Sequence, residues 1–302
     1  MKISGCGTAL ITPFKQDQSL DEDRLRRLVE WQVASGIHFL VPCGTTGETP
    51  TLTKDEWLRV VDITIEVAGG RVPIVAGATS NCTADAVEKA RELGKRKGVD
   101  AILTASPYYN KPTQEGQYQH FKAIAEAVEK PLVLYSVVGR TATNIEPATL
   151  GRLAKIPNII AVKEASGNIS QIAEVFNHVP DSFLVFSGDD SVTLPVISLG
   201  GVGIISVASN EIPKELSEMT CAALNNDWKK ARAILRKYLP LMQANFIESN
   251  PMPVKAVLAM MGRVEEVYRL PMVPMKKETR AKLEQIAAEA GLLNGHGVVS
   301  DL

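Results

Sequence analysis

The sequence predicts an α/β fold, namely a (β/α)8 TIM barrel with a C-terminal α-helical extension. Short runs rich in β-branched apolar residues recur at intervals of roughly 25 to 35 residues, which is the spacing of βα units in a parallel sheet. Each run precedes a longer segment in which apolar residues recur every three or four positions, as in an amphipathic helix. The eight runs are residues 5–11, 37–43, 72–78, 101–106, 132–138, 159–165, 183–187 and 202–208.

The segments between these runs predict the outer helices of the barrel. Residues 21–35, 54–68 and 83–97 place apolar residues at helical spacing with charges between them. Thr53 and Glu56 form the capping-box pattern that marks a helix start. An open doubly wound sheet is the alternative, but it usually has fewer strands and a glycine-rich first turn. The closed barrel is therefore the better prediction.

We expect three regions along the 302 residues. Residues 1–212 hold the eight βα units and are expected to form the catalytic barrel. From about residue 213 the pattern becomes all helical, with helices expected over 214–224, 228–246 and 278–290, so residues 213–293 are expected to form the helical extension. Residues 294–302 are expected to be a flexible tail.

Composition excludes several classes of protein. The chain has 33 Lys+Arg against 34 Asp+Glu and a formal net charge of -1, so no nucleic-acid partner is expected. The longest apolar runs are shorter than the roughly 20 residues of a membrane span, so no membrane association is expected. Four cysteines and four histidines show no metal-ligand spacing, and the first residues lack a signal-peptide pattern. These features predict a cytoplasmic protein.

Lys163 is the most informative residue at the predicted catalytic end of the barrel, which is formed by the carboxyl ends of the strands. It follows the apolar residues 159–162 in a strand that should be buried, and no other lysine lies inside a predicted strand. Burial lowers the pKa of an amine and makes it a nucleophile toward a carbonyl carbon, which favours Schiff-base chemistry. A structural ion pair is the competing interpretation. Glu164 is a poor partner for such a pair, because it faces the other side of the strand.

Two further groups are expected at the same end. Tyr135 ends the fifth strand and could exchange protons in a site without histidine, although a tyrosine there is more often a packing residue. The turn at residues 44–47 (GTTG) offers backbone N–H groups and two hydroxyls to a carboxylate, or is an ordinary βα turn.

The acidic residues near the strand ends argue against phosphate and against a metal. Asp189 and Asp190 follow the seventh strand, where phosphate-binding barrels have glycine-rich loops, and their charges would repel a phosphate. Glu48, Glu164 and these two aspartates lie on different strands and partly face outward, so no catalytic metal is expected.

The chain resembles the pyruvate-dependent class I aldolase and lyase family over about residues 3–292. Five motifs in the family's order carry the resemblance: GTTGE at 44–48, PYYNKP at 107–112, Tyr135 with Arg140, VKE at 162–164 and SGDD at 187–190. The resemblance implies a lysine Schiff base with pyruvate, carbon–carbon bond formation with a small aldehyde, no metal or organic cofactor, and a homotetramer that is a dimer of dimers. The aldehyde that it favours is aspartate semialdehyde, a substrate of the diaminopimelate and lysine pathway.

The resemblance also implies roles for single residues. Lys163 matches the Schiff-base lysine, while Tyr135, Thr46 and Tyr109 match a hydroxyl relay for protons, in which Tyr109 comes from a neighbouring subunit. Arg140 matches the residue that binds the carboxylate of the second substrate, a role that suits a planar guanidinium with paired donors. The residues that would hold or line the pyruvate carboxylate are Thr45, Thr46, Gly188 and Ile205.

The chain departs from the family pattern in two places. Where members commonly read Tyr-Asn-Val-Pro, it has Ser136 and Val138 in place of the Asn and Pro, so we expect the loop that carries Arg140 to be more mobile. The pocket that serves lysine feedback in this family is also altered, which leaves inhibition by lysine open. Its possible allosteric residues are Asn81 and Tyr108, which match, Asp85 in place of a common glutamate, and Lys54 and Trp57 in place of the histidines of some members.

Two other functions stay open on the sequence alone. The same chemistry could serve another aldehyde, in a lyase for N-acetylneuraminate, a 2-keto-3-deoxy sugar acid or 4-hydroxy-2-oxoglutarate. A catalytically silent barrel could instead bind a keto acid as a sensor or scaffold. The set of Lys163, Tyr135 and Thr46 argues against the silent barrel, because binding alone would not require it.

Overall fold

Eight parallel strands form one sheet in the computed structural model, which describes residues 3–293. The sheet order is β2-β1-β8-β7-β6-β5-β4-β3, and a parallel bridge between Leu40 and Ile74 brings β2 beside β3 and closes the ring. The predicted barrel is confirmed, and the expected tail at 294–302 lies outside the described residues. The strands are β1 (Gly5–Ala9), β2 (Phe39–Val41), β3 (Val75–Gly77), β4 (Ala101–Ala105), β5 (Leu132–Ser136), β6 (Ile159–Glu164), β7 (Leu184–Ser187) and β8 (Gly203–Ser206).

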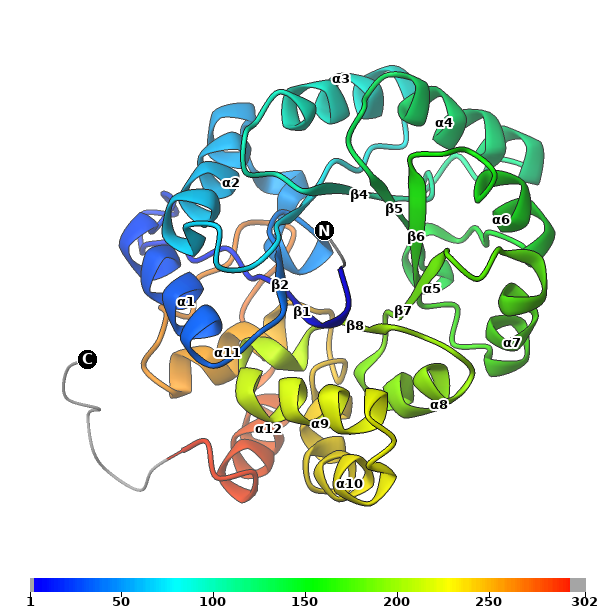
Figure 1. Ribbon diagram of the computed structural model, residues 1–302. Coiled ribbons are helices and arrows are strands. Elements are labelled where there is room, and N and C mark those ends of the chain that lie inside the picture. Colours follow the sequence, from blue (N-terminus) through cyan, green and yellow to red (C-terminus); the bar gives the residue numbers. More distant parts are fainter. Residues whose placement is uncertain (1–2, 294–302) are drawn as a thin grey trace.

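Helices surround the strands as an outer layer (Figure 1). The α-helices are α1 (Glu22–Ala34), α2 (Lys54–Ala68), α3 (Thr83–Gly94), α4 (Gln114–Glu126), α5 (Val138–Thr141), α6 (Pro147–Leu153), α7 (Ile169–His178), α8 (Thr193–Ser198), α9 (Pro213–Leu224), α10 (Trp228–Ala244), α11 (Met252–Met260) and α12 (Lys277–Glu289). Short 3-10 helices are η1 (Thr45–Gly47), η2 (Thr49–Thr51), η3 (Asp190–Val192) and η4 (Ala208–Asn210).

Local sequence signals account for several element ends. The capping box at the start of α2 is present, with the Glu56 N–H donating to Thr53 and the Thr53 N–H donating to Glu56. Strand β2 is shorter than the predicted run 37–43, because Cys43 adopts a φ of 58° and ends the extended conformation.

The apolar residues form two layers of core, one inside the barrel and one between the strands and the helices. Ala161 belongs to the inner layer, whereas Val162 packs in the outer layer. Side chains alternate along a strand, so Lys163, two residues after Ala161, shares the inner face. Glu164 faces the outer layer, where it accepts hydrogen bonds from Ser166 and Gln171.

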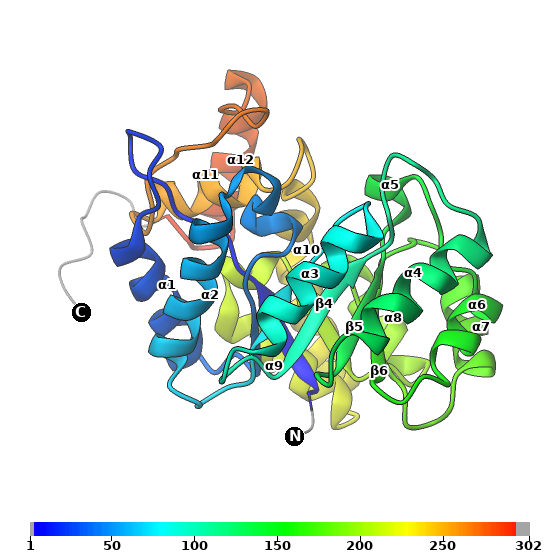
Figure 2. The ribbon, with the colours of Figure 1, turned by 90° about the horizontal axis from the view of Figure 1, so that it is seen from above.

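The C-terminal part contains the three predicted helices and one that the sequence analysis missed. Helices α9, α10 and α12 correspond to the predictions, and α11 is the missed helix, which starts among the prolines Pro251 and Pro253. Figure 2 shows α11 and α12 at the same end of the molecule as α5, opposite the end at which the chain begins. Helix α9 packs against β1, so the division of the chain at residue 213 stays a prediction.

No helix within residues 3–293 is both long enough and apolar enough to cross a membrane.

A buried ion pair joins α11 to the loop after β2. Lys255 Nζ lies 2.6 Å from Glu48 Oε1, and the two side chains are 0% and 1% exposed. The ammonium also lies 4.4 Å from the centre of the Phe14 ring. Because neither charge reaches water, each depends on the other for compensation.

We predict that Lys255→Met lowers the free energy of unfolding by about 3 to 5 kcal/mol, because it removes the only cation that forms an ion pair with the buried Glu48 carboxylate within the described residues. The double variant Glu48→Gln with Lys255→Met should recover most of this loss. Denaturant unfolding at matched protein concentration checks both. Equal stability of the single variant and the wild type would contradict the prediction.

Candidate active site

A cavity of about 650 Å³ opens at the carboxyl ends of the strands. Its walls contain groups from the loops after β2, β5, β6 and β7, together with the segment that connects α10 to α11. The sequence-predicted residues that line it are Thr45, Thr46, Tyr135, Arg140, Lys163 and Gly188. The fold therefore brings together side chains that lie far apart in the sequence.

Lys163 sits in β6 and is 4% exposed. Burial lowers its pKa to about 8, with Asp190 acting in the opposite direction and Arg140 adding to the decrease. Among the ion pairs of residues 3–293 none includes Lys163, which argues against the competing interpretation of a structural pair there. The site thus holds an amine whose neutral, nucleophilic form is accessible near neutral pH.

Tyr135 lies beside Lys163 on the adjacent strand β5, in register with it. The Lys163 Nζ is 4.4 Å from the centre of the Tyr135 ring. Burial raises the pKa of Tyr135 to about 12, against a smaller opposite effect of Arg140. The phenol is therefore protonated at neutral pH and is a possible proton donor within the cavity.

Thr45 and Thr46 occupy η1, directly after β2. Thr46 is 3% exposed, and its Oγ1 accepts a hydrogen bond of 3.0 Å from Nδ2 of Asn250. Thr45 is exposed to the cavity side of the loop. Two adjacent hydroxyls thus stand at the mouth of the barrel, within the wall that also contains Lys163.

Gly188 leaves space that the lysine side chain uses. A Cβ atom at this position would lie 2.7 Å from the Cβ of Ala165 and 3.1 Å from Cγ of Lys163. A side chain at position 188 would therefore collide with Ala165 and crowd the aliphatic part of Lys163, so this position requires glycine.

Arg140 lies in the short helix α5, which follows β5. Its Nη2 donates a hydrogen bond of 3.0 Å to the backbone carbonyl of Asn250. The rest of the guanidinium lines the cavity, where it offers donors to an anionic ligand. Ser136 accepts from the Ile145 N–H and donates to Asn144 Oδ1, so it belongs to the outer side of the strand. The greater mobility expected of this loop stays a prediction.

Two sequence-predicted site residues do not reach this cavity. Tyr109 is 88% exposed, has a φ of 72°, and is not among the residues that line the cavity. Ile205 is 1% exposed and packs in the inner core of the barrel, and it does not line the cavity.

The residues named as possible allosteric contacts lie in a different place. Lys54, Trp57 and Asp85 line a separate cleft of about 170 Å³ between α2 and α3. Lys54 forms an ion pair of 3.0 Å with Glu88, and the Trp57 indole donates to the Gly77 carbonyl. Asn81 is outside this cleft and donates to the Tyr108 carbonyl.

The segment before α11 was missed by the sequence analysis. Phe246, Glu248, Ser249 and Asn250 all line the active-site cavity, although they come from beyond the eight strands. Reading only the strand ends could not find them. The one available signal is the Asn-Pro-Met-Pro sequence at 250–253, which interrupts the helical pattern.

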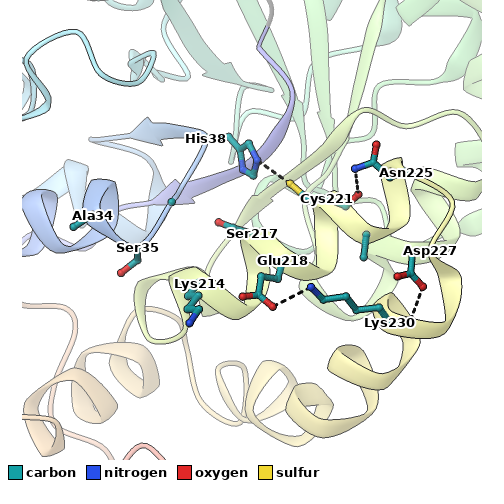
Figure 3. A pocket seen from close by; sticks show the side chains of 12 residues that line it. Ala34, Ser35, His38, Lys214, Ser217, Glu218, Cys221, Asn225, Asp227 and Lys230 are labelled. Atoms are coloured by element: carbon teal, nitrogen blue, oxygen red, sulfur yellow. Dashed lines mark hydrogen bonds and ion pairs between the residues drawn. The ribbon is translucent and has the colours of Figure 1, made fainter.

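A second cavity, of about 670 Å³, lies between the end of α1 and α9 (Figure 3). There His38 Nε2 is 3.1 Å from Cys221 Sγ, while His38 Nδ1 accepts from the Cys6 N–H, which assigns the ring proton to Nε2. Burial raises the pKa of Cys221 and lowers that of His38, so the pair is neutral rather than thiolate and imidazolium. His38 precedes β2 and lies at the opposite end of the strands from Lys163.

Within residues 3–293 no group of three or more His, Cys, Asp or Glu side chains is arranged to hold a metal ion.

Comparisons with known proteins find similar proteins that all belong to one family. The model of the dihydrodipicolinate synthetase family matches residues 2–290. A 4-hydroxy-tetrahydrodipicolinate synthase from Koribacter versatilis is 73% identical and covers 97% of this chain and 98% of its own length. One from Acidobacterium capsulatum is 61% identical, with 97% of each chain covered. A dihydrodipicolinate synthase structure from Acinetobacter baumannii, complexed with pyruvate, has a TM-score of 0.93 at 41% identity and covers 97% of this chain and 100% of that one.

The family match spans nearly the whole chain, and the fold of the solved structure agrees with the barrel described above. The chain therefore belongs to the dihydrodipicolinate synthetase family.

Proposed function

We propose that this chain condenses pyruvate with L-aspartate 4-semialdehyde through a Schiff base on Lys163 and forms 4-hydroxy-tetrahydrodipicolinate, in the diaminopimelate route to lysine. The observation that carries the proposal is the buried amine of Lys163, with a lowered pKa and the Tyr135 ring beside it. The names of the relatives and the pyruvate in the Acinetobacter baumannii structure support it.

The proposed reaction starts at the neutral amine. Lys163 Nζ attacks the keto carbon of pyruvate, and loss of water gives an iminium ion. The iminium accepts electrons from the adjacent methyl group, which loses a proton and becomes an enamine carbon. That carbon attacks the aldehyde and forms the new carbon–carbon bond. The amino group of the second substrate then replaces Lys163 on the imine carbon, which closes the ring and frees the lysine.

Other residues of the cavity supply proton transfer and binding. Tyr135 and Thr46 would move protons to and from the reacting oxygen and carbon, because the site offers hydroxyls and no histidine. Thr45 and Thr46 would hold the pyruvate carboxylate, next to the space left by Gly188. Arg140 would bind the carboxylate of aspartate semialdehyde with paired hydrogen bonds.

The proposal also covers the oligomeric state and the cellular location of the protein. Tyr109, which is 88% exposed, would enter the relay of a neighbouring subunit in a cytoplasmic homotetramer. An exposed aromatic ring of this size is well suited to an interface. No metal or organic cofactor takes part in the proposed reaction.

We predict that pyruvate and cyanoborohydride add a pyruvyl mass to the peptide that contains Lys163. The trapping rate should rise with pH through a midpoint near pH 8, because protonation removes the attacking lone pair below the pKa of about 8. Mass spectrometry after timed trapping measures it. Lys163→Arg should give no adduct. A midpoint near the ordinary value of 10.5 would show that burial does not activate the amine.

We predict a preference for aspartate semialdehyde over N-acetylneuraminate, 2-keto-3-deoxy sugar acids and 4-hydroxy-2-oxoglutarate, measured as the ratio of kcat/KM values. A higher value for any competitor would overturn the proposed substrate.

Arg140→Ala tests whether Arg140 is responsible for the preference for aspartate semialdehyde. It should lower kcat/KM for aspartate semialdehyde by about 10²-fold, as the loss of charge-assisted hydrogen bonds would. The KM for pyruvate should change by no more than about twofold, because Arg140 binds the other substrate and makes the smallest of the named contributions to the Lys163 pKa. Equal losses for both substrates would contradict its assigned role.

We predict that Tyr109→Phe and Lys163→Ala subunits complement each other. Each variant alone should have little activity, whereas dissociation and reassembly of the mixture should restore about a quarter of the wild-type rate. The reason is that about half of randomly formed pairs are mixed, and each has one complete site. Activity that stays at the level of the separate variants would argue that Tyr109 acts in its own subunit or not at all.

A further inference from the structure

One residue of the C-terminal segment contacts two of the proposed functional side chains at once. Asn250 is 3% exposed and lies between α10 and α11. Its Nδ2 donates to Oγ1 of Thr46 at 3.0 Å, and its backbone carbonyl accepts from Nη2 of Arg140 at 3.0 Å. Thr46 and Arg140 come from loops after β2 and β5, so Asn250 spans the mouth of the barrel between them.

The direction of the first bond fixes the chemistry of the threonine. An amide nitrogen can only donate, so it occupies a lone pair of the Thr46 hydroxyl and leaves the hydroxyl proton free. Within residues 3–293 the Thr46 hydroxyl donates to no protein acceptor. Its proton is therefore available to a reacting group in the cavity. A hydroxyl that donated to residue 250 would lose that ability.

The segment that carries Asn250 is held in place at a second point. The Lys255 N–H donates to the Pro251 carbonyl, and the Lys255 ammonium pairs with Glu48, two residues after Thr46. Tyr268 Oη donates to the Met252 carbonyl. Asn250 and Thr46 thus belong to two segments whose separation is set by a buried ion pair. Oδ1 of Asn250 has no partner within the described chain, so Thr46 alone orients the amide.

We propose that Asn250 is a positioning residue, whose side-chain N–H keeps the Thr46 hydroxyl as an acceptor and so directs the threonine proton toward the reacting groups. This inference rests on the proposed function of Lys163 and Thr46. In this proposal Asn250 does not contact the substrate, and its two hydrogen bonds have different effects. The side-chain N–H orients the Thr46 hydroxyl for proton transfer, whereas the backbone carbonyl holds the Arg140 guanidinium.

Asn250→Asp and Asn250→Ala test the proposal. The aspartate has nearly the same shape, but its carboxylate accepts the Thr46 proton and turns it away from the site. Asn250→Asp should therefore lower kcat by about 10²-fold, and Asn250→Ala, which leaves the hydroxyl free to rotate, by roughly tenfold. The KM for the aldehyde should change little in both, because the backbone carbonyl under Arg140 remains. A residue needed only for packing would give the reverse order.

Two further measurements keep the test independent of packing. The activity of Asn250→Asp relative to wild type should recover as the pH falls, because a protonated carboxyl again donates to Thr46. In the Thr46→Val background, Asn250→Asp and Asn250→Ala should become equivalent, since no hydroxyl proton remains to be misdirected. Thermal unfolding and the Lys163 adduct check that each variant is folded.

Exchange of the pyruvate methyl protons for deuterium, followed by NMR without any aldehyde, measures proton transfer in all variants, and the steady-state assay with the aldehyde measures KM. If the wild type exchanges these protons but does not use aspartate semialdehyde, the proposed function is wrong. The exchange rates of the variants would still test the role of Asn250, because that assay needs pyruvate only. Additive effects of Thr46→Val and Asn250→Asp, or an aspartate variant more active than the alanine variant, would overturn the proposal. So would a wild type that does not catalyse exchange.

Discussion

The buried ion pair between Glu48 and Lys255 is the contact on which the architecture of the site depends. Its two charges lie 2.6 Å apart without exposure to water, so we expect the loss of one partner to cost more unfolding free energy than the loss of one partner of an exposed pair. The pair ties α11 to the loop that carries Thr45 and Thr46. Through it, helices that follow the barrel in the sequence become part of the wall around Lys163.

The chemistry of Lys163 follows from a second constraint, the space inside the barrel. Ala161 and Lys163 share the inner face of β6, and Gly188 on the next strand's loop leaves room for the lysine stem. Desolvation in this interior lowers the amine pKa to about 8, while it raises the phenol pKa of Tyr135 to about 12. The same burial therefore places an amine that loses its proton more readily than usual beside a phenol that keeps its proton, which a proton-transfer reaction can use.

Strand periodicity predicted the barrel and the side of β6 on which Lys163 lies, because the side-chain period of two needs no long-range information. The strand ends pointed to Tyr135 and to the turn that contains Thr46, and the family resemblance added roles for Arg140 and Gly188. All four line the cavity. Neither signal could find α11 or Asn250. Their place depends on contacts such as Lys255 with Glu48, which are 207 residues apart in the chain. Pro251 and Pro253 also interrupt the helical sequence pattern of α11, although proline is compatible with the first turn of a helix.

Arg140 links substrate binding to the ionisation of the site. Its guanidinium lowers the pKa of both Lys163 and Tyr135 in the free protein, as a nearby positive charge must. A carboxylate bound to Arg140 would offset that charge and raise both pKa values. In the proposed reaction, Arg140 would favour the neutral amine needed for attack on pyruvate before the second substrate binds. After the amine has become an iminium, its own pKa would no longer matter, and a Tyr135 proton held more tightly would suit the later steps. The ordering of pyruvate before the aldehyde is thus consistent with the electrostatics of one arginine.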